Sequence, residues 1–494
     1  MQNRQQNKYR IQRRVAVYSI MVLSVMIMVP VSIALMLGYR FDFGSREISR
    51  TGLVQYDSSP RGASAFADGK RVGTTLTKNV VQPGERQFSM RLAGYRDWHK
   101  TLTIKPDTVT NLDYVRLVPV KLNTANVTEL ADVQAIKFSS SGRYLVGATI
   151  NKAGQPSIVW GDLRNNNTNP VFTHKEIDIA LLKGYQAGVA HQFEIVAWDT
   201  NERFVLLKYA NSDNVADVQW LRLDREKPDE LLDISSMVGL NIKKIIFNNS
   251  NELYILQDNG DLRLVQLDSS VISRPLISQI DDFSINQSTG TIVFASQTET
   301  DWTVGVWKKD WLSAQILETV PKSIQTKPTE VLSSRYYNKD TVVTSTSQGV
   351  RIYRGVMPGS DGLVVDSLKL VKVLTEGRQP QETSVSGNGR FVIVRVGGEM
   401  VSYDIERLSI SASPDLLTAG LSGWLDDFHL WSVDGENQLS IMEFDGTNRQ
   451  VLVPISGGNF GITLSNDGKF IYYFDKLEDK IVLKKLSMTA TQSS

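Results

Sequence analysis

The chain lacks cysteine altogether, although it is 494 residues long. Disulfide bonds, thiolate zinc sites, thiol nucleophiles and lipid attachment through a cysteine are therefore excluded. A domain without cross-links has to be stable through its hydrophobic core alone. This is feasible because a chain of this size buries a large fraction of its surface.

An excess of charge of one sign is also missing. Lysine and arginine number 54 and aspartate and glutamate 53, so the formal net charge is +1. Proteins that bind nucleic acid normally carry a basic patch or stripe. We therefore expect no nucleic-acid partner.

Motifs for catalysis are sparse. The chain contains no phosphate-binding loop of the Gly-x4-Gly-Lys-[Ser/Thr] form and no Gly-x-Ser-x-Gly elbow. None of its histidines forms a His-x-x-x-His pair or lies near an acidic cluster, so zinc hydrolysis has no support. The four histidines are His99, His174, His191 and His429. We predict no catalytic, cofactor-binding or metal site and no enzyme activity, and the binding residues stay unassigned.

Paired acidic residues keep one enzymatic alternative open. Asp426-Asp427 and Glu478-Asp479 are such pairs, and a glycosidase needs two carboxyl groups about 5–10 Å apart in a cleft. The loops of a repeat fold could bring distant carboxylates together, so an exported hydrolase or lyase is the alternative. Asp281-Asp282 and Asn466-Asp467-Gly468 lack the spacing of a twelve-residue calcium loop, and we interpret them as turn residues.

Long apolar runs are limited to one. Residues Val15–Leu37 contain no ionisable side chain except Tyr18, and about 20 apolar residues cross a hydrocarbon core of roughly 30 Å. Pro30 is tolerated in such a helix. The segment Met1–Arg14 carries five positive charges and no acidic residue, so the positive-inside rule places it in the cytoplasm. We predict a cytoplasmic basic tail over 1–14, a transmembrane helix over 15–38, and a remainder outside the cytoplasm.

A cleaved signal peptide is the competing interpretation of this segment. Its apolar core should be about 7–15 residues long and precede a small-x-small cleavage site. The run here is longer, and Leu35-Met36-Leu37-Gly38 is a poor cleavage site. We therefore expect an uncleaved, single-pass anchor.

Short β-like runs alternate with turn signals over residues 49–119. Asp68-Gly69 is a strong signal for a two-residue hairpin, and Pro83-Gly84 suits a type II turn with glycine at positive φ. Leu53–Tyr56, Gln87–Leu92 and Val109–Leu117 read as strands between such turns. We predict a small all-β module.

This module resembles a PEGA domain. The family shows a Pro-x-Gly-Ala start, a strand into Asp-Gly, Val-Gly-Thr-Thr, a Pro-Gly turn and then Gly-Tyr. Leu76 departs from the pattern, because a proline is common there. The resemblance implies a small β-sandwich that serves as a non-catalytic spacer or binding module of an envelope protein. The matching residues are Pro60, Gly62, Ala63, Asp68, Gly69, Val72, Gly73, Thr74, Thr75, Pro83, Gly84, Gly94 and Tyr95.

Internal repeats occupy the rest of the chain. Each unit has an apolar run, a polar turn and an aromatic-rich run, and most units continue into a third run that ends in a polar loop. Eight units are counted, with seven as the alternative. They begin at the runs 135–149, 194–209, 243–257, 281–296, 333–347, 382–396, 421–435 and 461–475.

Four strands per unit, arranged radially, would form a β-propeller. We expect it over 124–488, followed by a flexible tail over 489–494. Because the last unit lacks a fourth strand, the short strand Val127–Leu130 is expected to complete it. Turns such as Ser-Gly-Asn-Gly-Arg and Ser-Asn-Asp-Gly-Lys before an aromatic residue resemble TolB-like propeller repeats, as does the segment 444–448.

Aromatic residues recur at the strand ends of these units. We expect them to pack between the units, and an exposed sugar-binding platform is the alternative. The residues are Phe138, Trp198, Phe247, Phe283, Phe391, Trp424 and Phe470.

These features together predict an all-β, membrane-anchored bacterial protein of the cell envelope with an extracytoplasmic PEGA-like module and β-propeller. We expect it to bind or scaffold protein, cell-wall or glycan partners and to need no cofactor. Its partner stays unidentified at this stage.

Overall fold

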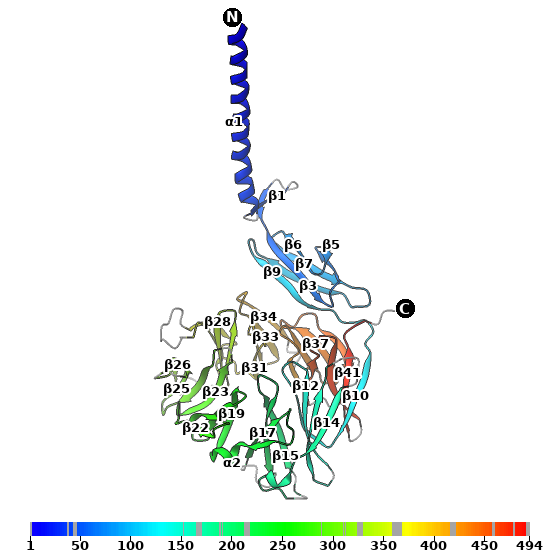
Figure 1. Cartoon of the computed structure of the whole chain (residues 1–494), viewed down its shortest axis with the longest axis vertical. Coiled ribbons are helices and arrows are strands. Elements are labelled where there is room, and N and C mark those ends of the chain that lie inside the picture. The colour runs from blue at the N-terminus through cyan, green and yellow to red at the C-terminus, as the bar shows by residue number, and fades with distance from the viewer. Residues whose placement is uncertain are drawn as a thin grey trace. The chain divides into compact units, whose positions relative to one another are not determined.

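A computed structural model of the chain describes residues 2–36, 39–42, 47–151, 153–164, 170–186, 189, 191–211, 218–287, 289–309, 311, 313–323, 330–357, 368–414, 421–456, 460–477 and 480–490. After one long N-terminal helix the described chain is almost entirely β-structure (Figure 1), which confirms the predicted all-β class. The chain forms two units: unit 1 comprises Met1–Lys121 and Thr489–Ser494, and unit 2 comprises Leu122–Met488.

Helix α1 spans Gln2–Met36 and therefore includes the basic segment before the apolar run. Its part Val15–Ile33 has a mean hydropathy of 2.2 and is long and apolar enough to cross a membrane, a test that a signal sequence also passes. The large apolar side chains there are 50–68% exposed. They thus need an apolar environment that the described protein does not supply. The hairpin of β1 (Tyr39–Asp42) and β2 (Glu47–Arg50) follows.

The expected β-module of unit 1 consists of two sheets. One has the strand order β6-β3-β9 and the other the order β5-β4-β7-β8. Tyr56 of β3 and Phe88 of β7 are buried and pack together across the sheets, with ring centroids 6.1 Å apart. The strands are β3 (Gly52–Ser59), β4 (Ser64–Ala67), β5 (Lys70–Thr74), β6 (Thr77–Val81), β7 (Gly84–Arg91), β8 (Trp98–Ile104) and β9 (Val109–Arg116).

The turns of this module follow their sequence signals. Asp68 and Gly69 connect β4 to β5 with φ values of 47° and 75°, as a type I′ hairpin requires at both central residues. Gly84 follows Pro83 with a φ of 107°. The predicted hairpin at 68–69 is therefore confirmed.

The side chain of Thr75 forms hydrogen bonds with the Gly-Ala end of the Pro-x-Gly-Ala segment. Its Oγ1 accepts hydrogen bonds from the backbone N–H of Gly62 at 3.0 Å and of Ala63 at 3.1 Å, and lies 2.9 Å from Ser58 Oγ. Because Thr75 is only 7% exposed and Ala63 is 0% exposed, the N–H of Ala63 depends on this hydroxyl rather than on bulk water.

We predict that Thr75→Val destabilises the module by about 1–3 kcal/mol, since valine has the shape of threonine but leaves the buried N–H of Ala63 without an acceptor. Hydrogen–deuterium exchange of peptides from 52–119 measures the loss as faster exchange in Thr75→Val. Thr74→Val is the matched control, because the Thr74 side chain is exposed. Equal exchange in the two variants would contradict the prediction.

The end of the chain belongs to unit 1. The backbone N–H of Ala490 donates to Tyr95 Oη at 2.9 Å. Residues 491–494 lie outside the described residues, so the flexible tail expected over 489–494 stays a prediction.

The described residues of unit 2 form eight four-stranded sheets. Each run expected to begin a repeat falls on the first two strands of one sheet. The first four sheets are β11 (Val133–Phe138), β12 (Tyr144–Ile150), β13 (Pro156–Asp162) and β14 (Val171–Glu176); β15 (His191–Trp198), β16 (Phe204–Asn211), β17 (Val218–Asp224) and β18 (Leu231–Asp233); β19 (Ile242–Asn249), β20 (Glu252–Gln257), β21 (Leu262–Gln266) and β22 (Val271–Ile272); β23 (Ile280–Asn286), β24 (Thr291–Gln297), β25 (Asp301–Lys308) and β26 (Gln315–Pro321).

The remaining sheets continue the same order, and two short helices, η1 (Ile179–Leu181) and α2 (Ile234–Val238), lie in connections. The sheets are β27 (Glu330–Tyr336), β28 (Lys339–Thr346), β29 (Gly349–Gly355) and β30 (Lys369–Leu374); β31 (Glu382–Val385), β32 (Phe391–Val396), β33 (Glu399–Asp404) and β34 (Ser409–Pro414); β35 (Ser422–Trp424), β36 (His429–Val433), β37 (Gln438–Glu443) and β38 (Gln450–Pro454); β39 (Thr463–Leu464), β40 (Phe470–Leu477), β41 (Lys480–Ser487) and β10 (Thr124–Ala131).

First strands of several successive sheets contact one another: β11 contacts β15, β19 contacts β23, and β27 contacts both β23 and β31. We call these eight first strands the inner strands: β11, β15, β19, β23, β27, β31, β35 and β39.

Strand β10 completes the last sheet. It pairs antiparallel with β41, from Thr124 opposite Leu486 to Ala131 opposite Lys480. The expectation that a strand around 127–130 supplies the missing fourth strand is thus confirmed.

The same turn recurs between the first two strands of several sheets. A serine or aspartate side chain accepts a hydrogen bond from the backbone N–H of the aromatic residue five positions later. The donor–acceptor pairs are Tyr144–Ser139 at 3.0 Å, Phe204–Asp199 at 2.8 Å, Phe391–Ser386 at 3.0 Å and Phe470–Ser465 at 2.9 Å. This shared turn explains why the repeats could be recognised from the sequence.

Apolar side chains of neighbouring sheets pack face to face. The predicted aromatic residues lie in or against these cores: Phe247 and Phe283 are 3% and 0% exposed, and Phe391 stacks on Phe444 with centroids 3.9 Å apart. Phe138, Trp198, Trp424 and Phe470 pack against the cores as partly buried residues. The predicted packing between neighbouring repeats is therefore confirmed for these side chains.

The last sheet also packs on the first. Leu145 and Val159 of the first sheet share a buried cluster with Tyr472, Phe474 and Leu483 of the last. Tyr472 Oη donates to the Leu163 carbonyl at 3.1 Å. At Gly142, a Cβ would lie 2.2 Å from the Leu464 carbonyl oxygen, so no side chain fits there.

The interpretation of Asp281 and Asp282 as turn residues is wrong. Both lie in strand β23. Lys244 Nζ lies 2.7 Å from Asp282 Oδ1, and Lys243 Nζ lies 3.4 Å from Asp281 Oδ1. These ion pairs with the neighbouring strand β19 compensate the two negative charges, and two successive acidic residues can therefore lie within a strand. Asn466–Gly468, by contrast, does form a turn.

Candidate functional site

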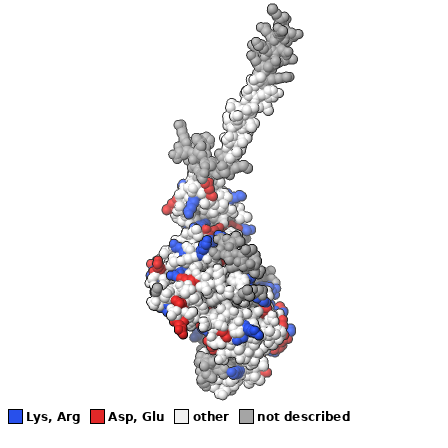
Figure 2. Space-filling model, turned by 90° about the vertical axis from the view of Figure 1, so that its left-hand side faces the viewer, with Lys and Arg blue, Asp and Glu red and all other residues white. Residues whose placement is uncertain are grey.

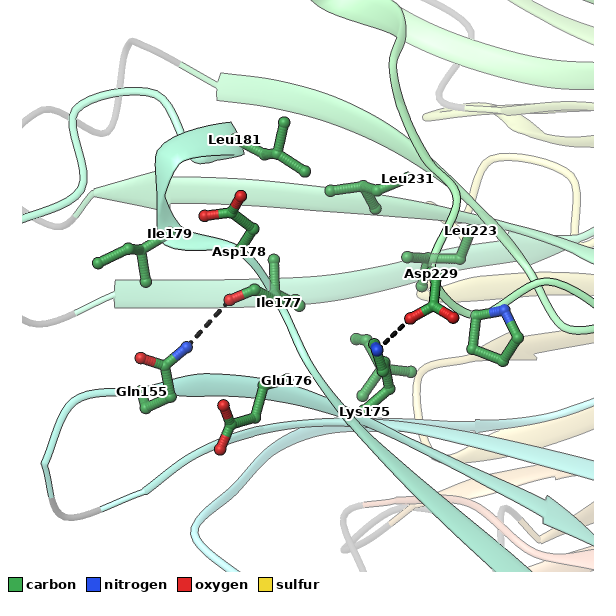
Figure 3. A pocket seen from close by; sticks show the side chains of 12 residues that line it. Gln155, Lys175, Glu176, Ile177, Asp178, Ile179, Leu181, Leu223, Asp229 and Leu231 are labelled. Atoms are coloured by element: carbon green, nitrogen blue, oxygen red, sulfur yellow. Dashed lines mark hydrogen bonds and ion pairs between the residues drawn. The ribbon is translucent and has the colours of Figure 1, made fainter.

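A groove of about 660 Å³ lies between the first and second sheets of unit 2 (Figure 3). Its apolar lining comes from Ile158 and Ile177 on one side and from Leu223 and Leu231 on the other. Ile179 and Leu181 of η1 stand beside it and are 41% and 44% exposed. The groove therefore combines an apolar lining with exposed branched side chains.

Polar groups border this groove. Lys175 of β14 forms an ion pair with Asp229, and Gln155 Nε2 donates to the Ile177 carbonyl at 3.0 Å (Figure 3). Asp178 caps η1 by accepting a hydrogen bond from the Ala180 N–H at 3.0 Å. This cap holds the apolar residues of η1 beside the groove, so the local sequence itself positions them.

A second cavity, of about 570 Å³, follows the inner strands β23, β27 and β31. We call it the inner cavity. Nine of its thirteen lining residues carry polar side chains, among them Asn286, Glu330, Ser333, Ser334 and Thr383. The lining thus mixes polar side chains with the apolar Ile285, Leu332 and Val385.

Of the carboxylates on three neighbouring inner strands, Glu330 lines the inner cavity. Burial raises the pKa of Glu330, and the negative charges of Asp282 and Glu382 raise it further, while Lys244 opposes the shift. Asp282 has Lys244 as its ion-pair partner, and Glu382 accepts a hydrogen bond from Arg395 Nη1 at 2.8 Å.

Two residues of the same lining have buried hydroxyl oxygens. Ser333 Oγ and Ser334 Oγ have no hydrogen-bond partner within the described part of the chain. Buried polar groups normally find a partner in the protein or in ordered water. Both oxygens are closed off from solvent, so an occupant of the cavity does not reach them directly.

Charges of both signs are interspersed on the face drawn in Figure 2, and the apolar part of α1 is uncharged there. This distribution agrees with the net charge of +1. The described face thus offers no extended region of one sign.

One of the four histidines lies beside an acidic pair examined in the sequence, and the other three lie elsewhere. His429 Nδ1 lies 2.8 Å from Asp426 Oδ1, whereas His191 contacts Tyr209 Oη at 2.9 Å. His99 is on β8 of unit 1 and His174 on β14. Among the described residues, no group of three histidine, aspartate or glutamate side chains could hold a metal ion. Glu478-Asp479 lies outside the described residues.

Sequence reasoning missed Glu330 and its neighbours. A signal exists, because Asp282, Glu330 and Glu382 all occur at or near the start of an inner strand in three successive repeats. Aligning the repeats on their first strands brings these positions together. Pairs adjacent in sequence, such as Asp426-Asp427, do not reveal such a cluster.

The architecture is that of a repeat protein of four-stranded sheets that carries a second, small β-module. Residues 51–119 match the family model of the PEGA domain, which agrees with the resemblance in the sequence. No curated protein matches the chain.

Two solved structures are similar to this chain. The C-terminal WD40 domain of Sif2 aligns at 9% identity and a TM-score of 0.47, over 73% of this chain and 97% of that chain. An oligogalacturonate lyase in complex with manganese aligns at 9% identity and a TM-score of 0.41, over 76% of this chain and 99% of that chain.

Proposed function

We propose that the protein is a membrane-anchored, extracytoplasmic component of a bacterial cell envelope that binds or scaffolds a protein or glycan partner. In this proposal unit 2 is a closed, eight-bladed β-propeller with TolB-like repeats. The pairing of β10 with β41 and the cluster shared by the first and last sheets support closure. The PEGA match supports a non-catalytic module in unit 1.

The anchor and its orientation can be tested cleanly, because the native chain has no cysteine to interfere. A single cysteine in Val109→Cys, whose parent residue is 56% exposed, should react with a membrane-impermeant maleimide on intact cells. Gln6→Cys should react only after the cells are permeabilised. Removal of the N-terminus as a signal peptide would abolish the Gln6→Cys signal under both conditions.

The groove of Figure 3 is the observation that carries the binding proposal. It is open, is lined by both apolar and charged residues, and keeps the exposed side chains of Ile179 and Leu181 beside charged groups. Protein interfaces combine an apolar centre with a polar rim in the same way. The groove therefore fits a macromolecular partner.

A photo-reactive amino acid at Leu181 should cross-link the partner in living cells. The same amino acid at Val271, which is 52% exposed on β22 of the third sheet, is the matched control. A discrete product at Leu181 and none at Val271 is the expected result. Identical patterns at both positions would contradict a partner in this groove.

The exported hydrolase or lyase keeps one supporting observation, the carboxylates of three inner strands around Glu330. Glycoside hydrolysis uses two carboxyl groups of different pKa. This alternative predicts turnover of an envelope glycan that is lost in Glu330→Gln. Release of no new reducing ends by the native protein would count against it.

A further inference from the structure

We propose that the first sheet of unit 2 accepts an extended peptide segment of a partner protein as a fifth strand, paired with the free edge of β14. The segment lies along the groove of Figure 3 and carries a basic residue close to Glu176. This inference rests on the proposed function, because it describes how the partner of that groove binds. It adds the conformation and the charge of the bound segment.

The outer edge of β14 offers unpaired backbone groups. β14 is the last strand of its sheet, and next to its ladder with β13 the Ile177 N–H donates to the opposite Pro156 carbonyl at 2.9 Å. Alternate residues of an antiparallel strand bond to opposite sides, so the N–H and C=O groups of Phe172, His174 and Glu176 point away from β13. None of these groups forms a hydrogen bond with a described residue. They are thus available to an added strand.

β14 also lacks the usual protection of an edge strand. Sheet edges are normally blunted by short strands, bulges or proline. The register of β14 with β13 runs without a shift over six residues, none of them proline. Every other outer strand of the described sheets has such a feature: β18 and β22 have three and two residues, β10, β26, β30 and β38 show register shifts, and β34 ends at Pro414.

The groove lies directly beside this edge. β14 lines it from the first sheet, and Leu223 and Leu231 line it from the second. Side chains alternate between the two faces of a strand, so every second side chain of an added strand faces the second sheet. The two leucines and the exposed Leu181 offer these side chains an apolar contact.

Charge complementarity points to a basic residue in the bound segment. Glu176 and Asp178 line the groove (Figure 3), are exposed, and have no ion-pair partner among the described residues. Lys175, the basic side chain of the described lining, is paired with Asp229. Lys152 of the adjacent turn lies outside the described residues, and counting it still leaves three acidic side chains against two basic ones. An opposite charge beside Glu176 on the added strand is therefore favourable.

A proline at an outward-facing position of the full-length protein tests the backbone pairing. His174→Pro removes an N–H that points away from β13, so the bonds within the first sheet stay in place. Cross-linking of the partner from the photo-reactive amino acid at Leu181 should fall about tenfold, because a hydrogen bond is lost and the proline ring blocks an approaching strand. His174→Ala is the matched control, since it keeps the N–H and should retain the product.

Moving the photo-reactive amino acid along β14 tests the extended conformation. Val171 and Thr173 are both exposed and lie on the same face of the strand, roughly 7 Å apart. Mass spectrometry of the two products should place the attachment points two residues apart on the partner, with a lysine or arginine nearby. A helical segment would shift them by about four residues, because a helix rises only about 1.5 Å per residue.

Reversal of one charge tests the complementarity. Glu176→Lys should lower the yield of the Leu181 product about fivefold, because an attraction between the strands becomes a repulsion. Glu436→Lys is the control: Glu436 is exposed in the turn between β36 and β37 of the seventh sheet, and its reversal changes the net charge equally. Equal yields from the two variants would overturn the basic residue.

The outcomes separate this inference from the proposed function. Absence of any Leu181 product in the native chain would remove both. A product as strong in His174→Pro as in His174→Ala, or attachment points four residues apart, would overturn the fifth strand and leave a partner in the groove. Products that contain only peptides of this chain would replace the partner by a second copy. The urea midpoint of His174→Pro is measured alongside, and if it falls, the mapping from Val171 and Thr173 decides.

Discussion

Replacing Arg390 by methionine is expected to destabilise unit 2 by about 3–5 kcal/mol, the usual cost of breaking a buried ion pair from one side. The side chains of Arg390 and Asp404 are only 7% and 3% exposed. Arg390 Nε and Nη2 donate to the two carboxylate oxygens of Asp404 at 3.0 and 2.8 Å. Methionine fills a similar volume but leaves the buried Asp404 carboxylate with only the more distant Arg407, whose Nε lies 3.9 Å from Asp404 Oδ2.

Arg203→Met is the matched comparison, because Arg203 makes the same two-pronged contact with Asp224 in the second sheet. The Arg203 side chain is 35% exposed, so in Arg203→Met water can take over part of its interaction with Asp224. The expected loss of stability is therefore about 1–2 kcal/mol. Urea unfolding followed by tryptophan fluorescence measures both. Adding Asp404→Asn to Arg390→Met should recover part of the loss. Equal losses in the two single variants would contradict this account.

Leu483→Ala is expected to cost about 2–5 kcal/mol, as does truncation of other fully buried leucines. Leu483 is 0% exposed and belongs to the cluster shared by the first and last sheets. If unit 2 is a closed ring, the two sheets hold each other in place. The unfolding of the whole unit should then shift to lower urea as one transition.

Leu477→Ala is the control on the same sheet, because Leu477 is 59% exposed and exposed substitutions change stability by about 0.5 kcal/mol or less. An early partial transition confined to the last sheet in Leu483→Ala would show that the sheets unfold independently. That outcome would contradict the closed propeller.

Much of the fold could be predicted because it is encoded locally. The hairpin at Asp68-Gly69 and the turns before Tyr144, Phe391 and Phe470 depend on residues a few positions apart. Turn residues carry a physical preference that a single sequence reveals. The partner of β10 was also predictable, since a repeat with one strand missing needs one from elsewhere.

The inner cavity was not predictable in this way. Asp282, Glu330 and Glu382 meet only because their sheets are neighbours, and about 50 residues of chain separate each from the next. The β-strand assignment of Asp281 and Asp282 depended on Lys243 and Lys244 of another sheet. Long-range compensation of this kind overrides local preference.

The return of the chain to unit 1 has a mechanical consequence. Lys121 and Thr489 both belong to unit 1, and the segments that leave them enter β10 and β41, which are paired side by side. A pull on unit 2 therefore acts on one covalent connection, at Lys121, and on one noncovalent attachment, at Thr489 and Ala490. The hydrogen bond from Ala490 to Tyr95 has to break before the second attachment is released, and the force then passes through β10 alone.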